Sequence, residues 1–331
     1  MQMKAMSFNF GGDSVFYTRL LSYLKENGIL LESLKHIRSH VFILKCHNAE
    51  PMILKRFDSA GDWENQKLLT SLLKERGFYK TYDIYDIPPF YYEYGVFGCI
   101  QYLEPASRPF HFSDSRDRSE GLSLLDEFHA ISSQLPREFS VRIHRFRQID
   151  KWQERLQAFR QNFQNVSRYV SDSILKSWLS WGEWALQGMR DHQYDLCAEE
   201  NVIIHGDCAH HNFLRSKEGE LFLIDFDLIS SAPAMMDDLQ YCNRILSYLE
   251  NPAEELWTYP EINRYKNNTA FLYALTYPAD VFREWNRLIR ENQLGNGAQL
   301  HHIWKLTVEE YPKRMKMNAG ISQKILESSG A

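Results

Sequence analysis

The chain has 331 residues, a formal net charge of −5, and 44% hydrophobic and 24% charged residues. That length exceeds what one hydrophobic core usually supports, so we expect two lobes. The negative balance argues against a nucleic-acid-binding protein, because neutralising backbone phosphates requires basic patches. The N-terminus lacks the apolar segment of a signal peptide. No run of about 18 apolar residues occurs, so we expect neither a transmembrane helix nor a membrane partner.

The first hundred residues alternate between helical and strand patterns. Apolar residues at helical spacing predict a helix over 14–27 that ends at Asn27-Gly28. Strands are expected at 29–37, 41–47 and 51–57, followed by a helix at 63–74 that ends near Gly77. Two further strands follow within 91–103, joined near Gly95. This order predicts a small mixed lobe with an antiparallel sheet.

The remainder of the chain is predicted to be mostly helical. A polar stretch with prolines, serines and mixed charges at 105–118 indicates the boundary between the lobes. We therefore predict an N-terminal lobe over 1–103 and a C-terminal lobe over 104–331, an α+β fold. Tryptophans and other apolar residues on the predicted helices are expected to fill the core rather than bind a cofactor. The helical stripes are Leu122, Leu125, Phe128 and Leu135; Trp152, Leu156, Phe159 and Phe163; and Ile174, Trp178, Trp181 and Ala185.

Five cysteines are scattered through the chain without a CxxC spacing. An odd, scattered set is typical of a reducing compartment, so we expect a cytoplasmic protein whose cysteines are small buried hydrophobes. They are Cys46, Cys99, Cys197, Cys208 and Cys242.

The strongest chemical signal is the segment NVIIHGDCAHHNFL at 201–214, followed by LFLIDFDL at 221–228. Magnesium-assisted phosphoryl transfer needs an acidic residue that orients the acceptor hydroxyl, and a carboxamide and a carboxylate that hold the metal. Asp207 is our candidate catalytic base or acceptor-orienting residue. Asn212 in the same loop and Asp225 after an apolar strand are our candidate metal ligands. A hairpin with a turn at 216–219 would bring these two ligands together.

Several neighbouring residues have two possible roles. Asp227 either binds a second metal or caps the following turn. His205 is expected to form structural hydrogen bonds rather than to act in catalysis. Adjacent residues on an extended loop point in opposite directions, so we expect one of His210 and His211 to pack inward and the other to line the acceptor site, rather than a zinc site.

The HGDxxxxN loop followed by IDFD resembles the aminoglycoside phosphotransferase and choline kinase superfamily, which has a two-lobed protein-kinase-like fold. The resemblance extends over most of the chain, from about residue 31 to the C-terminal helices. His129 in LLDEFHAI resembles the histidine that ends a family helix. Asp238-Leu239 resembles the pair after the metal-binding motif, and Asp238 is expected to brace the catalytic loop. The segment ALTYPADVFREWNRLI at 274–289 resembles the kinase-like spore-coat proteins of spore-forming bacteria.

The resemblance also implies residues that contact the nucleotide. Lys55 in MILKRF resembles the lysine that contacts the nucleotide phosphates, and Glu64 in DWENQKLL resembles its helix partner. The end of GCIQYL resembles the hinge, where backbone groups from Gln101 to Leu103 would contact adenine. A surface role remains the alternative for both Lys55 and Glu64.

The chain departs from the family in the turn between the first two strands. This turn reads HIRSHVFI and contains no glycine, although glycines let backbone N–H groups approach phosphate closely. Arg38, Ser39 and His40 could still donate hydrogen bonds. Losing one charge-assisted hydrogen bond costs ~1.5–3 kcal/mol, which weakens nucleotide binding without abolishing it.

The sequence therefore predicts an ATP- and Mg²⁺-dependent kinase that phosphorylates a hydroxyl of a small molecule such as an aminoglycoside, choline or a sugar. The alternative is a kinase-like structural or interaction protein, such as a spore-coat component, which the glycine-free turn favours. Neither the acceptor nor the oligomeric state can be read from the residues.

Overall fold

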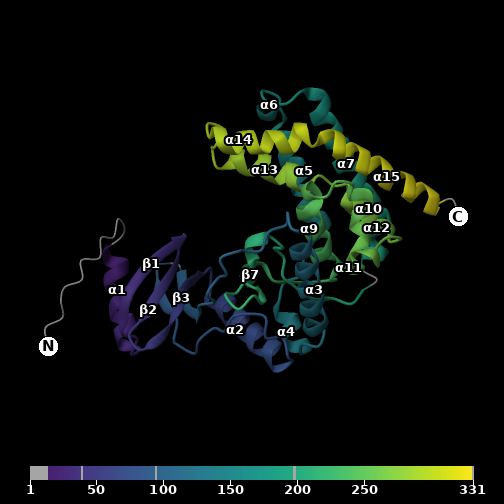
Figure 1. Ribbon diagram of the computed structural model, residues 1–331. Coiled ribbons are helices and arrows are strands. Elements are labelled where there is room, and N and C mark those ends of the chain that lie inside the picture. The colour runs from purple at the N-terminus through teal and green to yellow at the C-terminus, as the bar shows by residue number, and fades with distance from the viewer. Residues whose placement is uncertain (1–13, 39, 94, 197–198, 330–331) are drawn as a thin grey trace. The chain divides into compact units, whose positions relative to one another are not determined.

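The computed structural model describes residues 14–38, 40–93, 95–196 and 199–329. Contacts between residues divide the chain into two compact units (Figure 1). The first comprises residues 1–106 with 216–218, and the second comprises 107–215 with 219–331. The contacts thus divide the chain after residue 106, whereas the sequence places the boundary after residue 103.

The first unit is an antiparallel five-stranded sheet with helices packed on it. The strands follow the order β1-β2-β3-β5-β4, and α2 contacts β3 and β5. Phe16, Leu20 and Leu24 of α1 are buried against apolar side chains of the sheet, which confirms the predicted amphipathic helix. The elements are α1 (Ser14–Glu26), β1 (Leu31–Arg38), β2 (Val41–Cys46), β3 (Ala49–Phe57), α2 (Ala60–Glu75), β4 (Phe90–Tyr92) and β5 (Gly95–Gln101).

The turn between β1 and β2 is short. Arg38 pairs with Val41, so only residues 39 and 40 separate the two strands. His40 has a φ of 60°, in the left-handed region that favours glycine. Ser39, which the sequence offered as a phosphate contact, lies outside the described residues. His40 therefore adopts a backbone conformation that glycine reaches more easily than a residue with a side chain.

The second unit is mostly helical, as predicted. Figure 1 shows α13 and α14 side by side, and α9 packs against α3. The helices are α3 (Ser115–Ser132), α4 (Arg137–Arg142), α5 (Gln148–Gln161), α6 (Phe163–Val166), α7 (Asp172–Asp191), α8 (Gln193–Leu196), α9 (Met235–Ile245), α10 (Pro252–Glu255), α11 (Pro260–Asn263), α12 (Thr269–Leu275), α13 (Ala279–Arg290), α14 (Gly297–Trp304) and α15 (Tyr311–Ser329). Short helical turns are η1 (His210–Asn212), η2 (Phe226–Leu228), η3 (Leu246–Tyr248), η4 (Leu256–Thr258) and η5 (Lys305–Glu309).

Aromatic residues fill the core of this unit. The rings of Trp152 and Tyr277 stack with centroids 4.1 Å apart and planes inclined by only 6°. Trp178 and Trp285 are fully buried, and the indole N–H groups of both donate to Thr307. Trp152 and Trp178 belong to the core, as the sequence predicts. No helix among the described residues is long and apolar enough to cross a membrane.

Two small antiparallel strand pairs carry the motif segments. β6 (Val202–Ile204) pairs with β9 (Ser230–Ala232), and β7 (Phe213–Arg215) pairs with β8 (Leu221–Leu223). The second pair is the predicted hairpin, and Gly219 in its turn has a φ of 92°.

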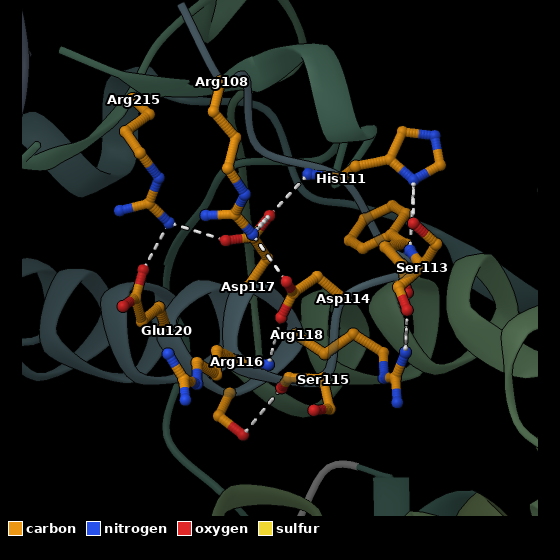
Figure 2. A network of polar contacts seen from close by, with 12 residues as sticks. Arg108, His111, Ser113, Asp114, Ser115, Arg116, Asp117, Arg118, Glu120 and Arg215 are labelled. Carbon is orange, nitrogen blue, oxygen red and sulfur yellow. Dashed lines mark hydrogen bonds and ion pairs between the residues drawn. The ribbon is translucent and has the colours of Figure 1, made fainter. Parts of the chain in front are cut away.

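A polar network anchors β7 at the N-terminal end of α3 (Figure 2). The buried carboxylate of Asp117 accepts hydrogen bonds from Arg215 at 2.8 Å, from Arg108 at 3.1 Å and from the backbone amide of His111 at 2.9 Å. Arg215 also pairs with Glu120. Two guanidinium groups and an amide compensate the buried charge of Asp117, so the network fixes the hairpin on which the motif residues lie.

Candidate functional site

The loop after β6 turns sharply at Gly206. This glycine has a φ of 78°, and a Cβ atom placed on it would lie 2.1 Å from the carbonyl oxygen of Leu228. Only glycine fits this position, because any side chain would collide with backbone. The turn directs the following residue, Asp207, out of β6 and into the loop.

His205 stabilises the same loop from inside. Its ring is fully buried, with Nε2 2.9 Å from the carbonyl oxygen of Ile224. Nδ1 accepts a hydrogen bond from the amide of Asp207 at 3.3 Å. Both ring nitrogens are therefore used within the protein, and the predicted structural role of His205 is confirmed.

The residue that braces the loop is Asp237. Its carboxylate accepts hydrogen bonds from the backbone amides of His205 at 2.6 Å and Gly206 at 2.9 Å. The prediction that Asp238 braces the loop is wrong by one residue, because Asp238 accepts a hydrogen bond from Arg264 at 2.8 Å instead. Successive residues of a helix point about 100° apart, so only one of the two acids faces the loop.

His129 holds Asp237 in turn. Its Nε2 lies 2.9 Å from the carboxylate, and both side chains are buried. Burial by itself lowers the pKa of His129, but the carboxylate of Asp237 outweighs burial and raises the pKa overall. Burial raises the pKa of Asp237, but His129 and the neighbouring polar groups outweigh it and lower the pKa. Both directions favour a charged pair beneath the loop.

Two further residues on the same face of α9 complete the support. The side-chain oxygen of Gln240 accepts a hydrogen bond from the backbone amide of Cys208 at 2.6 Å. Its side-chain nitrogen donates one to the carbonyl of Gly206 at 2.9 Å. Arg244 pairs with the carboxylate of Asp207 at 3.0 Å. Sequence reasoning missed both residues. The available signal was their spacing of three and seven residues from Asp237, which places all three on one helical face.

The two predicted metal ligands lie at the same end of the β7–β8 hairpin. The carbonyl of Asn212 accepts the amide of Ile224 at 2.9 Å, and Asp225 is the next residue, with a φ of 71°. The Nδ2 group of Asn212 donates to the carbonyl of Asp207 at 2.9 Å. Its Oδ1 atom is buried and has no hydrogen-bond partner. A buried acceptor without a partner is costly, so this oxygen fits a metal ligand.

The remaining motif residues lie close to these ligands in the sequence. Asp227 is exposed in η2, and both of its predicted roles stay predictions. His211 lines a cavity beside Asp207, whereas the ring of His210 lies 5.7 Å from that of His111. The described residues contain no group of three or more histidine, cysteine or acidic side chains that could hold a metal.

A cavity of about 340 Å³ opens beside Asp207 within the second unit. Residues of α5, α9 and α13 line it, together with the loop that carries Asp207 and His211. Its position next to the candidate base makes it the candidate acceptor site.

The predicted nucleotide-contacting residues lie in the first unit. Lys55 is buried on β3, with Nζ 5.4 Å from the centroid of the Phe57 ring. Glu64 is exposed on α2. On the adjacent strand β5, Gly98 pairs with Lys55. A Cβ atom placed on Gly98 would lie 2.6 Å from Nε1 of Trp63.

The predicted hinge follows β5. The backbone amide of Gln101 donates a hydrogen bond to the carbonyl of Asp83 at 2.8 Å. The side-chain oxygen of Gln101 accepts a hydrogen bond from the backbone amide of Asp83 at 3.2 Å. Leu103 lies beyond the strand and is half-buried. Because the amide of Gln101 is already used, any adenine contact from an amide in this segment falls to the residues after it.

Residues 115–269, which include Asp207, Asn212 and Asp225, match the phosphotransferase enzyme family. No curated protein sequence matches the chain. The structure is similar to an aminoglycoside phosphotransferase from Alicyclobacillus acidocaldarius, with a TM-score of 0.67 at 15% identity over 93% of this chain and 96% of the other.

Two more solved structures share the fold. A spectinomycin phosphotransferase in complex with ADP and spectinomycin has a TM-score of 0.58 at 15% identity, over 92% of this chain and 98% of the other. A choline kinase from Streptococcus pneumoniae has a TM-score of 0.50 at 13% identity, over 94% and 100%. The family match and these folds confirm the resemblance to the aminoglycoside phosphotransferase and choline kinase superfamily and the α+β, protein-kinase-like fold. The spore-coat resemblance stays a prediction.

Proposed function

We propose, on the premise of the phosphotransferase-family match at residues 115–269 and the protein-kinase-like fold, that the chain transfers phosphate from ATP to a hydroxyl of a small molecule. The observation that carries the proposal is the loop after β6. There, Asp207 lines a cavity while the buried oxygen of Asn212, five residues further along, lacks a partner. This pairing supplies a base for the acceptor and a ligand for a metal.

Each residue has a distinct role in the proposed reaction. Asp207 accepts the proton of the acceptor hydroxyl, and Arg244 orients its carboxylate. Asn212 and Asp225 would hold Mg²⁺, which neutralises charge on the transferred phosphate when bound. Lys55 contacts the nucleotide phosphates with Glu64 as its partner, and the backbone between Gln101 and Leu103 contacts adenine. The ADP complex of the similar spectinomycin phosphotransferase supports the use of a nucleotide.

A catalytically inactive, kinase-like structural protein is the second candidate. The observation that favours it is the two-residue turn between β1 and β2, which contains no glycine and holds His40 at a φ of 60°. Such a turn offers phosphate few closely approaching backbone amides. For the inactive structural protein we propose a place in the spore coat. For the active kinase we propose a place in the cytoplasm.

Replacing the candidate base separates the two functions. We expect Asp207→Asn to lower kcat by ~10²–10⁴-fold, because general-base assistance contributes about that much. Nucleotide affinity should change by no more than a few-fold, because the residue acts on the acceptor. The measurement is ATP hydrolysis to water and phosphate transfer to a panel of hydroxyl compounds, with exposed Asp172→Asn as the matched control. If the unmutated protein turns over no faster than Asp207→Asn, the structural candidate is favoured.

A further inference from the structure

The cavity beside Asp207 is dominated by positive charge. Five cationic and three acidic side chains line it, although the chain as a whole carries a net charge of −5. The cations come from three helices of the second unit and surround the candidate base. They are Lys151 and Arg155 of α5, Arg244 of α9, and Arg283 and Arg287 of α13.

The acidic side chains of α13 do not balance these cations. Glu284 is shared by two arginines, Arg283 at 2.9 Å and Arg287 at 2.5 Å. Asp280 pairs with Arg314, a buried arginine of α15 that does not line the cavity. Glu284 therefore pairs with two guanidinium groups of the cavity, and Asp280 pairs with a guanidinium group outside it.

The two cations of α5 have no acidic partner at ion-pair distance among the described residues. Lys151 lies with Nζ 4.8 Å from the centroid of the Phe146 ring. Burial, followed by the charge of Arg155, lowers the pKa of Lys151 to about 8, against the opposing effect of Asp207. Burial, followed by the charge of Arg283, also lowers the pKa of Arg155. With a pKa of about 8, Lys151 carries its charge at neutral pH. Two partly buried like charges therefore lie close together without a carboxylate of the described residues at ion-pair distance.

The metal ligands do not explain this cluster. Neither Asn212 nor Asp225 lines the cavity. Both lie at the end of the β7–β8 hairpin, whereas Lys151 and Arg155 belong to α5, which packs against α13. The charge is therefore located on the acceptor side of Asp207 rather than around the candidate metal.

We infer that the acceptor is an anionic small molecule, a hydroxyl compound that also carries a carboxylate or phosphate group. Lys151 and Arg155, assisted by Arg283, bind the anionic group, while the hydroxyl faces Asp207. The inference rests on the proposed function. Its physical reason is that clustered cations gain a counter-ion when an anion binds, whereas a cationic acceptor such as choline would be repelled.

Matched sets of hydroxyl compounds test the inference by direct binding. The probes are glycerol, glycerate and glycerol 3-phosphate; glucose, gluconate and glucose 6-phosphate; and the cations glucosamine and choline. Calorimetric titration is carried out with the full chain and Mg²⁺-ADP. We expect an anionic member to bind at least about tenfold more tightly than its neutral partner and than either cation. Comparing glycerate with glycerol 3-phosphate distinguishes a carboxylate from a phosphate.

Variants assign the binding to the cluster. Arg155→Gln and Lys151→Gln should each weaken binding of the anionic probe by roughly ten- to hundredfold, the value of one charge-assisted hydrogen bond. Arg290→Gln is the control, since this exposed arginine of α13 does not line the cavity. Thermal unfolding shows whether each variant is folded. If Arg155→Gln does not fold, the less disruptive Lys151→Gln alone tests the inference.

Three results would overturn the inference: no anionic probe binds, the neutral partners bind as tightly, or the variants raise the KM for ATP and leave probe binding unchanged. In the last case the cations serve the nucleotide. The proposed function fails separately, when ATP hydrolysis and phosphate transfer are absent from the unmutated protein, and anion binding measured by calorimetry can survive that failure.

Discussion

The buried side-chain oxygen of Asn212 is the residue-scale feature that bears most directly on the proposed metal site. It is buried and unpartnered, while the amide nitrogen of the same side chain is held by the carbonyl of Asp207. That hydrogen bond fixes which way the carboxamide points. The oxygen is therefore presented in a fixed orientation next to the hairpin end where Asp225 lies, which is how a protein prepares a metal ligand before the metal binds.

The metal assignment predicts that nucleotide binding depends on Mg²⁺. In the unmutated protein, ATP should bind more tightly with Mg²⁺ than without it, because Asn212 and Asp225 together hold the ion that screens the phosphates. Asp225→Ala should remove most of this difference, an effect of roughly tenfold or more. Calorimetry with and without Mg²⁺ measures it, and exposed Asp172→Ala is the control. Equal affinity in both conditions for the unmutated protein would show that the assignment is wrong.

At the scale of elements, α9 holds the loop that carries Asp207. Three of its side chains, Asp237, Gln240 and Arg244, contact successive parts of the loop. These contacts include three backbone amides and the carboxylate of Asp207. The helix is in turn tied to α3 through His129. A shift of α9 would therefore move the candidate base, so we regard the three as positioning residues.

The buried pair of His129 and Asp237 predicts a pH-dependent contribution to stability. Because the pKa of His129 is raised above its usual 6.5, the contribution is complete below pH 6.5 and is lost as pH rises through the raised pKa. Because the pKa of Asp237 is lowered below 3.8, its contribution is present above pH 3.8 and is lost as pH falls through the lowered pKa. The pair therefore stabilises the fold most between these two values.

We expect His129→Gln to lower the melting temperature most within this window. Glutamine can keep a hydrogen bond to Asp237 but not the charge, so the difference between the unmutated protein and the variant should shrink as pH rises through the raised pKa of the histidine. Thermal unfolding of both proteins from pH 4 to pH 9 measures the difference. A difference that does not change with pH would show that the charge of His129 does not contribute to stability.

At the scale of the whole molecule, the proposed roles are distributed over both units. The candidate nucleotide contacts, Lys55 and Glu64, belong to the first unit, and the base and metal ligands belong to the second. Variants in the two units should therefore affect different kinetic constants. Those in the first should act on the KM for the nucleotide, and Asp207→Asn should act on kcat.

Lys55→Ala should raise the KM for ATP, because the phosphates lose a charged contact. Glu64→Ala should have the same effect but more weakly, because Lys55 then loses the partner that we assign to it. Exposed Lys25→Ala in α1 is the control. If Glu64→Ala leaves both kinetic constants unchanged, the partner is another acid near the start of α2, Asp58 or Asp62. Asp62 is the weaker of these, since it already accepts a hydrogen bond from Ser59 at the N-cap.

The sequence by itself determined the features that depend on short stretches of chain. The alternation of apolar residues predicts the strands and helices of the first unit. The β7–β8 hairpin follows from apolar runs around a turn, and it brings Asn212 and Asp225 together over only a dozen residues. The role of His205 is predictable for the same reason, because its partners belong to the loop and the hairpin.

Only the tertiary structure decided the features that depend on which helix faces which. Asp237 and Asp238 are adjacent and chemically identical, and the packing of α9 alone selects the first to brace the loop. Lys151 and Arg283 lie more than a hundred residues apart, so composition gives a net charge of −5 and conceals a cationic cavity. The physical reason is that local periodicity fixes the faces of a helix, whereas long-range packing chooses the neighbours that those faces meet.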